Sequence, residues 1–154
     1  LDSKRLGGWG WSWGGTFTLY SMSHSDRFRA GVSVAPVTDF RNYDSVYTER
    51  YLGLPSDNPD IYKDAAVVNT ASQLHGRLLL VQGTGDDNVH MENSIQYIQQ
   101  LIEAQIPYDL QLYPRKTHSI SGPGVRTHLY TRILAHFEQY LMPPVQAPAQ
   151  SPAQ

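Results

Sequence analysis

The sequence contains no cysteine, which excludes disulfide bonds and thiol chemistry and is compatible with any cellular compartment. It has no run of about 20 apolar residues, which argues against a membrane span. It also lacks an excess of either charge. Its 12 basic and 14 acidic residues give a net charge of −2 without a basic stripe, so nucleic acid is not an expected partner. What is present is an ordinary globular composition, 40% hydrophobic and 17% charged, in 154 residues, about one domain.

Short apolar segments alternate with segments of helical period along the chain. Strands are predicted at Leu6 to Trp11, Phe28 to Ala35, Leu78 to Gln82 and Tyr108 to Tyr113. Helices are predicted from Gly14 to His24, from Met91 until Pro107 bars continuation, and from Val125 to Leu141. Residues 36–60, rich in tyrosine and without a clean period, are predicted to be an excursion with short helical pieces. This order predicts an α/β fold with a mostly parallel sheet flanked by helices.

The stretch GWGWSWGG at residues 8–15 gathers all three tryptophans around one serine. Gly10 to Gly14 fit G-x-S-x-G, in which a sharp strand-to-helix turn exposes the central serine, here Ser12. Small residues let backbones pass closely, so we expect the following helix to pack against the strand through Gly14 and Gly15. The pattern also arises by chance in many proteins. A catalytic interpretation therefore requires a base and an acid elsewhere in the chain.

Two further strand-end loops carry candidates for that base and acid. Asp86 and Asp87 follow the predicted strand Leu78 to Gln82, and His118 follows Tyr108 to Tyr113. Functional groups collect at the carboxyl ends of parallel strands. The order Ser…Asp…His is that of the α/β-hydrolase triad, in which the imidazole takes the serine proton and the carboxylate orients the imidazole. Spacing does not separate Asp86 from Asp87. The alternative for this pair is a helix N-cap or a turn ahead of the next helix, and the two residues could serve one role each.

The remaining histidines have plainer interpretations. His90 lies beside the acids, where it caps the following helix or lines the pocket. The others fall in helical or linker stretches and are expected to be surface or packing residues: His24, His75, His128 and His136. No two histidines share an HxxxH spacing with a carboxylate between them, so neither a metal site nor a cofactor is predicted.

Four segments together resemble one family of enzymes: GWSWGG, VAPVTDFRNYDSVYTERYLGLP, GTGDDNVH and THSISG. They are similar to the catalytic domain of the dipeptidyl peptidase IV branch of the prolyl oligopeptidase family of serine peptidases, over about residues 5 to 142. The YDSVYTERYLGLP segment is the most specific, because it is no generic hydrolase motif. The resemblance implies a triad of Ser12, Asp86 and His118, and release of N-terminal X-Pro or X-Ala dipeptides through an acyl-enzyme.

The resemblance also implies substrate contacts. The backbone N–H of Trp13 would donate to the oxyanion, and Asn88 would hydrogen-bond a substrate carbonyl. The walls of a small pocket for Pro or Ala would be the Trp13 ring, Val37, Phe40, Tyr43, Tyr47 and Val89, with Tyr43 also near the substrate amine. The alternative for these aromatic residues is core packing. Trp13 stands where the family usually has Tyr, and Phe40 where close relatives have Trp, so a different pocket shape is expected.

Residues 1–142 would then be the C-terminal part of an α/β-hydrolase domain. The resemblance implies that a longer protein also holds the first half of that domain, with a tyrosine of the oxyanion hole, and a β-propeller whose paired glutamates hold the substrate amine. It further implies a homodimer and a periplasmic or secreted location. Residues 143–154, rich in Pro, Ala and Gln, are predicted to form a disordered tail.

Two alternatives stay open. The same triad would serve an acylaminoacyl peptidase or an esterase of this fold. The chain would otherwise be a non-catalytic half-domain that needs the N-terminal part or a partner chain. An exposed sheet edge beside the Ser12 strand would invite such pairing.

Overall fold

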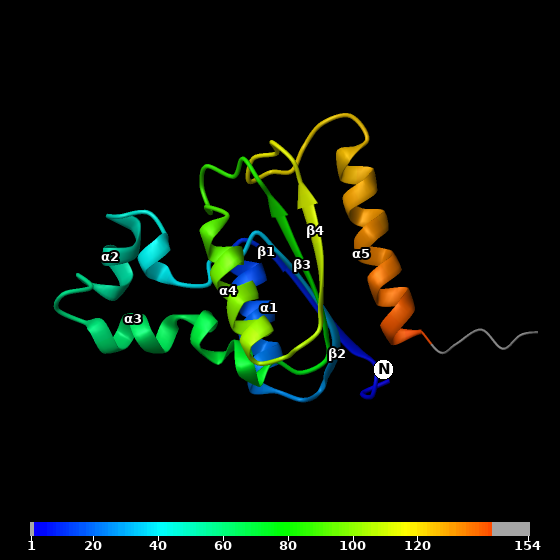
Figure 1. Ribbon diagram of the computed structural model, residues 1–154, viewed down its shortest axis with the longest axis horizontal. Helices are drawn as coiled ribbons and strands as arrows, with labels where there is room; N and C mark the ends of the chain where they lie inside the picture. Colours follow the sequence, from blue (N-terminus) through cyan, green and yellow to red (C-terminus); the bar gives the residue numbers. More distant parts are fainter. Residues whose placement is uncertain (1, 143–154) are drawn as a thin grey trace, which may run out of the picture.

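The computed structural model describes residues 2–142, and the predicted tail lies outside the described residues. Within them, four strands form one sheet in the order β1-β2-β3-β4 (Figure 1). The strands are β1 (Leu6–Trp11), β2 (Phe28–Val34), β3 (Arg77–Gly83) and β4 (Tyr108–Tyr113). Each pair of neighbours runs parallel, which confirms the predicted parallel sheet.

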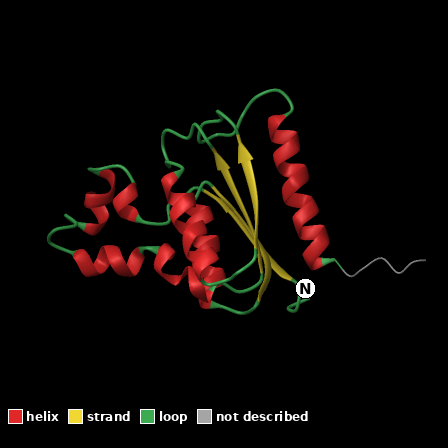
Figure 2. Ribbon diagram, viewed as in Figure 1, coloured by secondary structure: helices red, strands yellow, loops and turns green. Residues whose placement is uncertain are grey.

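Helices cover both faces of the sheet (Figures 1 and 2). α1 (Trp13–His24) and α4 (Glu92–Glu103) lie on one face, and α5 (Val125–Leu141) lies on the other. α1 connects β1 to its neighbour β2, and α4 connects β3 to its neighbour β4. Because all the strands run parallel, the loops that follow them lie at the same edge of the sheet. Among residues 2–142, no helix has both the length and the apolar character needed to cross a membrane.

The two central strands are buried on both faces. Leu78, near the start of β3, packs in a cluster with residues of α1 and α4. Leu79 and Val81 point to the opposite face, where they pack with Leu129 and Ile133 of α5. Successive side chains of a strand point to opposite faces, so a strand covered by helices on both sides is a continuous apolar run. This is why LLLV can be recognised as a central strand from sequence.

The excursion between β2 and β3 consists of short helical pieces, as predicted. They are η1 (Phe40–Asn42), α2 (Tyr47–Leu52), α3 (Pro59–Ala65) and η2 (Val67–Gln73). α2 and α3 project away from the sheet (Figure 1). Tyr62 of α3 is 2% exposed and packs in a cluster with Val37 and Phe40 from the loop after β2 and Val89 from the loop after β3. The excursion thereby joins two of the strand-end loops.

His136 of α5 is a fully buried titratable residue in the core. Its Nε2 lies 3.1 Å from the backbone oxygen of Arg77, so Nε2 carries the proton of the neutral ring. Its Nδ1 lies 3.4 Å from Oδ2 of Asp109 without forming a hydrogen bond. Burial lowers the pKa of His136 below 6.5, although the Asp109 carboxylate acts in the opposite direction.

Acidification is therefore expected to destabilise the fold through His136. Because the unfolded chain binds the proton more readily, the free energy of unfolding falls once the pH drops below 6.5 and continues to fall down to the lower folded pKa. The measurement is urea unfolding at about pH 7.5 and about pH 5.5 for the wild type and His136→Gln. The variant keeps an N–H donor for the Arg77 carbonyl, and we expect it to lose less stability on acidification. An equal loss in both proteins would contradict the assignment to His136.

Candidate active site

Ser12 occupies the sharp turn between β1 and α1. Its φ of 58° and ψ of −120° are disfavoured for a residue that carries a side chain. The turn is fixed on both sides: the Ser12 N–H donates to the Val34 carbonyl oxygen at 2.8 Å, and the Ser12 carbonyl oxygen accepts from the Thr16 N–H at 3.0 Å. A strained strand-to-helix turn at the carboxyl edge of a parallel sheet is the geometry expected of a nucleophile elbow.

Two glycines allow the chain to fold back at this turn. A Cβ on Gly10 would lie 2.1 Å from the backbone carbonyl carbon and oxygen of Gly14, and a Cβ on Gly15 would lie 2.9 Å from the Val34 carbonyl oxygen. The expected close approach of the helix to β1 is confirmed at Gly14, whose backbone carbonyl group and Cα lie next to Gly10, but it is wrong for Gly15, which packs against Ser33 and Val34 of β2. A Cβ on Gly14 would meet nothing within 4 Å in the described part of the chain. The close approach requires a missing side chain on the strand, at Gly10, rather than on the helix.

We therefore expect Gly10→Ala to lower the free energy of unfolding by at least about 3 kcal/mol, since the clashing atoms are backbone and cannot rotate away. Gly8→Ala is the matched control, two residues earlier on the same face of β1. Its Cβ would lie 3.3 Å from the Phe28 ring, a side chain that can adjust. We expect it to cost less than about 1 kcal/mol. Urea unfolding of both variants tests this, and equal losses would contradict it.

Asp86 lies in the loop after β3, and its side chain is 0% exposed and surrounded by donors. Its Oδ1 accepts from the backbone N–H groups of Asn88 (3.1 Å) and Val89 (2.9 Å). Its Oδ2 accepts from Nε2 of Gln82 at 3.1 Å and lies 2.8 Å from Nδ1 of His118. These partners offset the cost of burying a charge. They also hold the carboxylate in one orientation, toward the imidazole.

Asp87, which spacing alone left equivalent to Asp86, is exposed and makes no side-chain hydrogen bond within residues 2–142. Of the alternative for the two acids, the helix N-cap is wrong, whereas Asp86 does hold a turn by accepting from the N–H groups of Asn88 and Val89. α4 has Met91 at its N-cap and no side-chain cap, and the carbonyl oxygen of His90 accepts from the Asn93 N–H at 3.1 Å. The two neighbouring acids therefore differ in burial and in partners, and Asp86 is the one in contact with the imidazole.

His118 lies in the loop after β4, and 23% of its side chain is exposed. Its loop is tied to the strand that carries the serine. The indole Nε1–H of Trp11, the residue before Ser12, donates to the backbone oxygen of His118 at 2.9 Å. The guanidinium of Arg126 in α5 lies 5.8 Å from the centre of the Trp11 ring, within the range of a cation–π contact. Sequence reasoning missed this link, because an indole beside the serine has no distinctive spacing to the histidine.

The Asp86 contact determines which nitrogen of His118 carries a proton. A carboxylate only accepts hydrogen bonds, so Nδ1 is the donor and Nε2 of the neutral ring is left as an acceptor. An imidazole in this tautomer can take a proton from a hydroxyl group. Within the described residues, the side chains of Ser12 and His118 are not hydrogen-bonded to each other. In many enzymes such bonds tighten when substrate binds.

The residues expected to line the substrate pocket fall into two groups. Three are at most 6% exposed and share one hydrophobic cluster, against which Tyr43 packs: Val37, Phe40 and Val89. The others are exposed: Trp13, Tyr47 and Asn88. The Trp13 and Phe40 ring centres lie 5.0 Å apart. Partial burial raises the pKa of Tyr43, aided by the nearby Asp44 and Asp86 carboxylates, so its phenol stays protonated and able to donate.

The cavity between these groups is small. It measures about 40 Å³ and is lined by Trp13, Phe40, Tyr47, Thr48, Tyr51 and Leu52. Pockets for small ligands usually measure roughly 300–1,000 Å³. The aromatic rings therefore pack on one another here. Phe40 packs in the core, and its role as a wall of the substrate pocket stays a prediction.

Sequence reasoning also missed buried polar residues that connect the strand-end loops. The side-chain oxygen of Asn93 accepts from the Thr38 N–H at 3.0 Å, and its Nδ2 donates to the His90 carbonyl oxygen at 3.2 Å. The Thr38 hydroxyl donates in turn to the Asn93 backbone oxygen at 2.7 Å. Gln82, near the end of β3, is likewise buried, and its Nε2 donates to Oδ2 of Asp86. The one available signal was a lone polar residue closing the apolar run LLLV.

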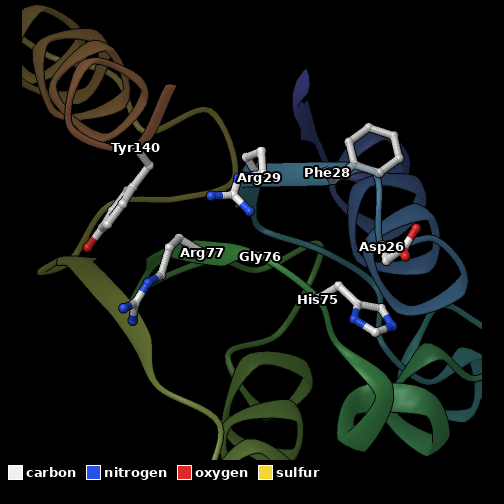
Figure 3. A pocket seen from close by; sticks show the side chains of 7 residues that line it. All are labelled: Asp26, Phe28, Arg29, His75, Gly76, Arg77 and Tyr140. Carbon is white, nitrogen blue, oxygen red and sulfur yellow. The ribbon is translucent and has the colours of Figure 1, made fainter. Parts of the chain in front are cut away.

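A larger hollow lies at the other edge of the sheet, away from these residues. It measures about 380 Å³ and is lined by Asp26, Phe28, Arg29, His75, Gly76, Arg77 and Tyr140 (Figure 3). It involves the starts of β2 and β3 and contains none of the predicted site residues. Among residues 2–142, no three histidine or carboxylate side chains are grouped as ligands for a metal ion.

A sequence model described as the prolyl oligopeptidase family matches residues 1–143. The chain belongs to the prolyl oligopeptidase family. Among curated members of the family, it is 46% identical over 124 residues to probable dipeptidyl-aminopeptidase B of Neurospora crassa, covering 78% of this chain and 13% of that protein. It is 40% identical over 141 residues to dipeptidyl peptidase 4 of Felis catus, covering 89% of this chain and 18% of that protein.

Among solved structures of the prolyl oligopeptidase family, Porphyromonas gingivalis dipeptidyl peptidase 4 matches with a TM-score of 0.90 and 46% sequence identity. The match covers 92% of this chain and 20% of that one. The fold is accordingly that part of an α/β-hydrolase domain which contains the strand-to-helix turn at Ser12 and the loops that follow β3 and β4. The chain spans less than a fifth of the length of the curated relatives above.

Proposed function

We propose that this chain carries the nucleophile, acid and base of a serine peptidase that releases dipeptides from the N-termini of peptides. The observation that carries the proposal is the 2.8 Å contact between Asp86 and His118, at the same sheet edge as the strained Ser12 turn. In this proposal Ser12 is the nucleophile, His118 the general base and Asp86 the orienting acid. The names of the relatives, dipeptidyl-aminopeptidase B and dipeptidyl peptidase 4, support the reaction type.

The proposed reaction follows from the proton assignment at His118. The Ser12 hydroxyl oxygen bonds to the substrate carbonyl carbon while its proton passes to Nε2 of His118. Asp86 keeps Nδ1 protonated and stabilises the imidazolium, and the Trp13 N–H donates to the oxygen that becomes negative. The C–N bond then breaks, and the leaving amine takes the proton from Nε2. Water repeats the sequence and releases the dipeptide from the acyl-enzyme.

The proposed preference for Pro or Ala at the second substrate position rests on the apolar group after β2 and β3. Val37, Phe40 and Val89 offer no polar side-chain atom to a substrate, which suits a small apolar residue. The protonated Tyr43 phenol is suited to a position near the substrate amine, and the exposed Asn88 to a substrate carbonyl. An acylaminoacyl peptidase or esterase would share the triad and differ in these contacts.

A second candidate, a half-domain that needs another segment, is favoured by one specific observation. α1 exposes three aromatic side chains along one face: Trp13 (37%), Phe17 (61%) and Tyr20 (49%). The adjacent β1 pairs with β2 alone among the strands of residues 2–142. A helix with apolar side chains on all sides is normally buried on all sides. We therefore propose that a further segment of a longer polypeptide covers α1 and β1 and is required for full activity.

Turnover of Gly-Pro-anilide, acetyl-Ala-anilide and a short acyl ester distinguishes these candidates. The assay compares the 154-residue chain with the longer polypeptide that the second candidate requires. Gly-Pro cleavage without acetyl-Ala cleavage supports the dipeptidyl peptidase. Preference for the blocked amide or the ester supports the alternative hydrolases. Activity restricted to the longer polypeptide supports the required second segment, and no hydrolysis by either would refute the proposed function.

A further inference from the structure

Gln82 places a primary amide in the buried interior of the protein. It ends the apolar run of β3 and is 0% exposed. Burying an amide without hydrogen bonds destabilises the folded protein, so both its oxygen and its nitrogen need partners. In this protein both have them, and the partners connect the acid loop with α4.

The amide nitrogen of Gln82 has two short contacts. Nε2 donates to Oδ2 of Asp86 at 3.1 Å and to the backbone oxygen of Val89 at 3.1 Å. The amide oxygen accepts from the Ser94 hydroxyl of α4 at 2.9 Å. Both groups near the nitrogen are acceptors, so the reverse orientation would place the amide oxygen against two other oxygens. The partners therefore determine which way the amide points.

The oxygen that accepts from Gln82 is the one that contacts His118. Oδ2 of Asp86 receives the amide N–H on one side and lies 2.8 Å from Nδ1 of the imidazole on the other. A donor on a carboxylate oxygen reduces the negative potential that the oxygen presents to its other partner. Gln82 is thus placed to control both the position of this oxygen and the strength of its pull on the His118 proton.

We propose that Gln82, held in orientation by Ser94, is a positioning residue that fixes the Asp86 carboxylate against His118 and moderates its charge. The inference rests on the proposed function, in which His118 is the base. Three residues with charged side chains belong to the elements around His118, and Asp86 is the one in contact with the imidazole. They are Asp86 from the loop after β3, Lys116 in the loop of His118 itself, and Arg126 of α5, which donates to the Ser119 backbone oxygen at 3.1 Å. Of these, Asp86 is the group that Gln82 contacts.

The test replaces the amide with an unbranched side chain of similar size, in Gln82→Met. Without the amide donor, Oδ2 directs its full charge to Nδ1, so the pKa of His118 is expected to rise. Proton NMR titration of the His118 ring measures this in the 154-residue chain and needs no catalysis. In the active protein, kcat for Gly-Pro-anilide is expected to fall about tenfold with KM little changed, and the acid limb of kcat/KM to move to higher pH.

Gln111→Met is the matched control. It makes the same substitution on the neighbouring strand β4, where the amide of Gln111 donates to the Leu112 backbone oxygen at 3.0 Å. It is expected to leave the pKa of His118 and kcat unchanged. Should Gln82→Met not fold, Ser94→Ala tests the same link. It frees the amide to rotate and should raise the pKa of His118 by a smaller amount.

The outcomes separate the inference from the function on which it rests. A raised pKa of His118 in Gln82→Met but not in Gln111→Met supports the positioning role even in a chain that shows no hydrolysis. An unchanged or lowered pKa in Gln82→Met and in Ser94→Ala would overturn it, even if the wild type is a fully active peptidase. A loss of thermal stability with an unchanged pKa would overturn it too, because that result indicates a purely structural role.

Discussion

Ser12→Ala is expected to lower kcat for dipeptide release by about 10⁶, the order seen when a serine nucleophile is removed. The variant also loses all covalent labelling by a fluorophosphonate. The reason is chemical: the Asp86–His118 pair can only take up a proton, and without the hydroxyl no group at the turn can form the acyl-enzyme. Any remaining rate would come from direct attack by water. Single-turnover kinetics and probe labelling in the natural polypeptide measure both effects.

Ser119→Ala is the control for this experiment. Ser119 follows the histidine directly, and its exposed hydroxyl shares a 3.2 Å hydrogen bond with that of Ser121. A serine next to the base but away from the turn should label and turn over as the wild type does. Loss of labelling in Ser119→Ala with retention in Ser12→Ala would place the nucleophile outside the G-x-S-x-G turn and refute the assignment. The strained backbone at Ser12 predicts that labelling is lost in Ser12→Ala and retained in Ser119→Ala.

The architecture was predictable because its determinants are local. Alternating apolar runs gave strands whose ends agree with the structure within one residue, for example Phe28 to Ala35 against Phe28–Val34. The helix predicted from Val125 to Leu141 has those same bounds. The serine, acid and histidine each follow a different strand, and parallel strands have their carboxyl ends at the same edge, so the three loops were predicted to lie together.

What sequence could not supply is the identity of groups that act through space. Asp86 and Asp87 are adjacent and chemically alike, and spacing cannot tell which one turns inward. The deciding interactions come from backbone N–H groups and from Gln82, all of which depend on the exact path of the loop. The error at Gly15 has the same origin. A motif shows that small residues are needed, but only the packing shows which of them another backbone approaches.

The pocket was the least predictable part, for a physical reason. Residues 36–60 form short helical pieces that are stabilised by packing and show no repeating pattern in the sequence. Their aromatic rings contact one another edge to face, with the ring centre of Tyr47 5.5 Å from that of Tyr43 and 5.3 Å from that of Tyr51. Such rings serve equally well as packing or as pocket walls, and the resemblance to a family was needed to favour a pocket.

Asp86→Asn is expected to lower kcat by about 10⁴ with little change in the fold, as when the acid of a serine triad is made neutral. The amide that replaces the carboxylate can donate to Nδ1, which leaves the proton on Nε2 of His118, facing the serine. An imidazole in that tautomer cannot accept the hydroxyl proton. It would also lack the negative charge that stabilises the imidazolium. Steady-state kinetics together with urea unfolding separate this effect from simple destabilisation.

Asp87→Asn provides the matched control, because the same chemical change is made one residue away. Its side chain is exposed and has no hydrogen-bond partner within residues 2–142, so both kcat and stability should stay within about twofold and about 0.5 kcal/mol of the wild type. Because the two variants make the same chemical change, a difference between them reports the position of the carboxylate and not the loss of a negative charge. Equal losses in the two variants would mean that general negative charge near the base is what matters. A larger loss in Asp87→Asn would show that Asp87, and not Asp86, orients the imidazole. It would also refute the tautomer inferred for His118.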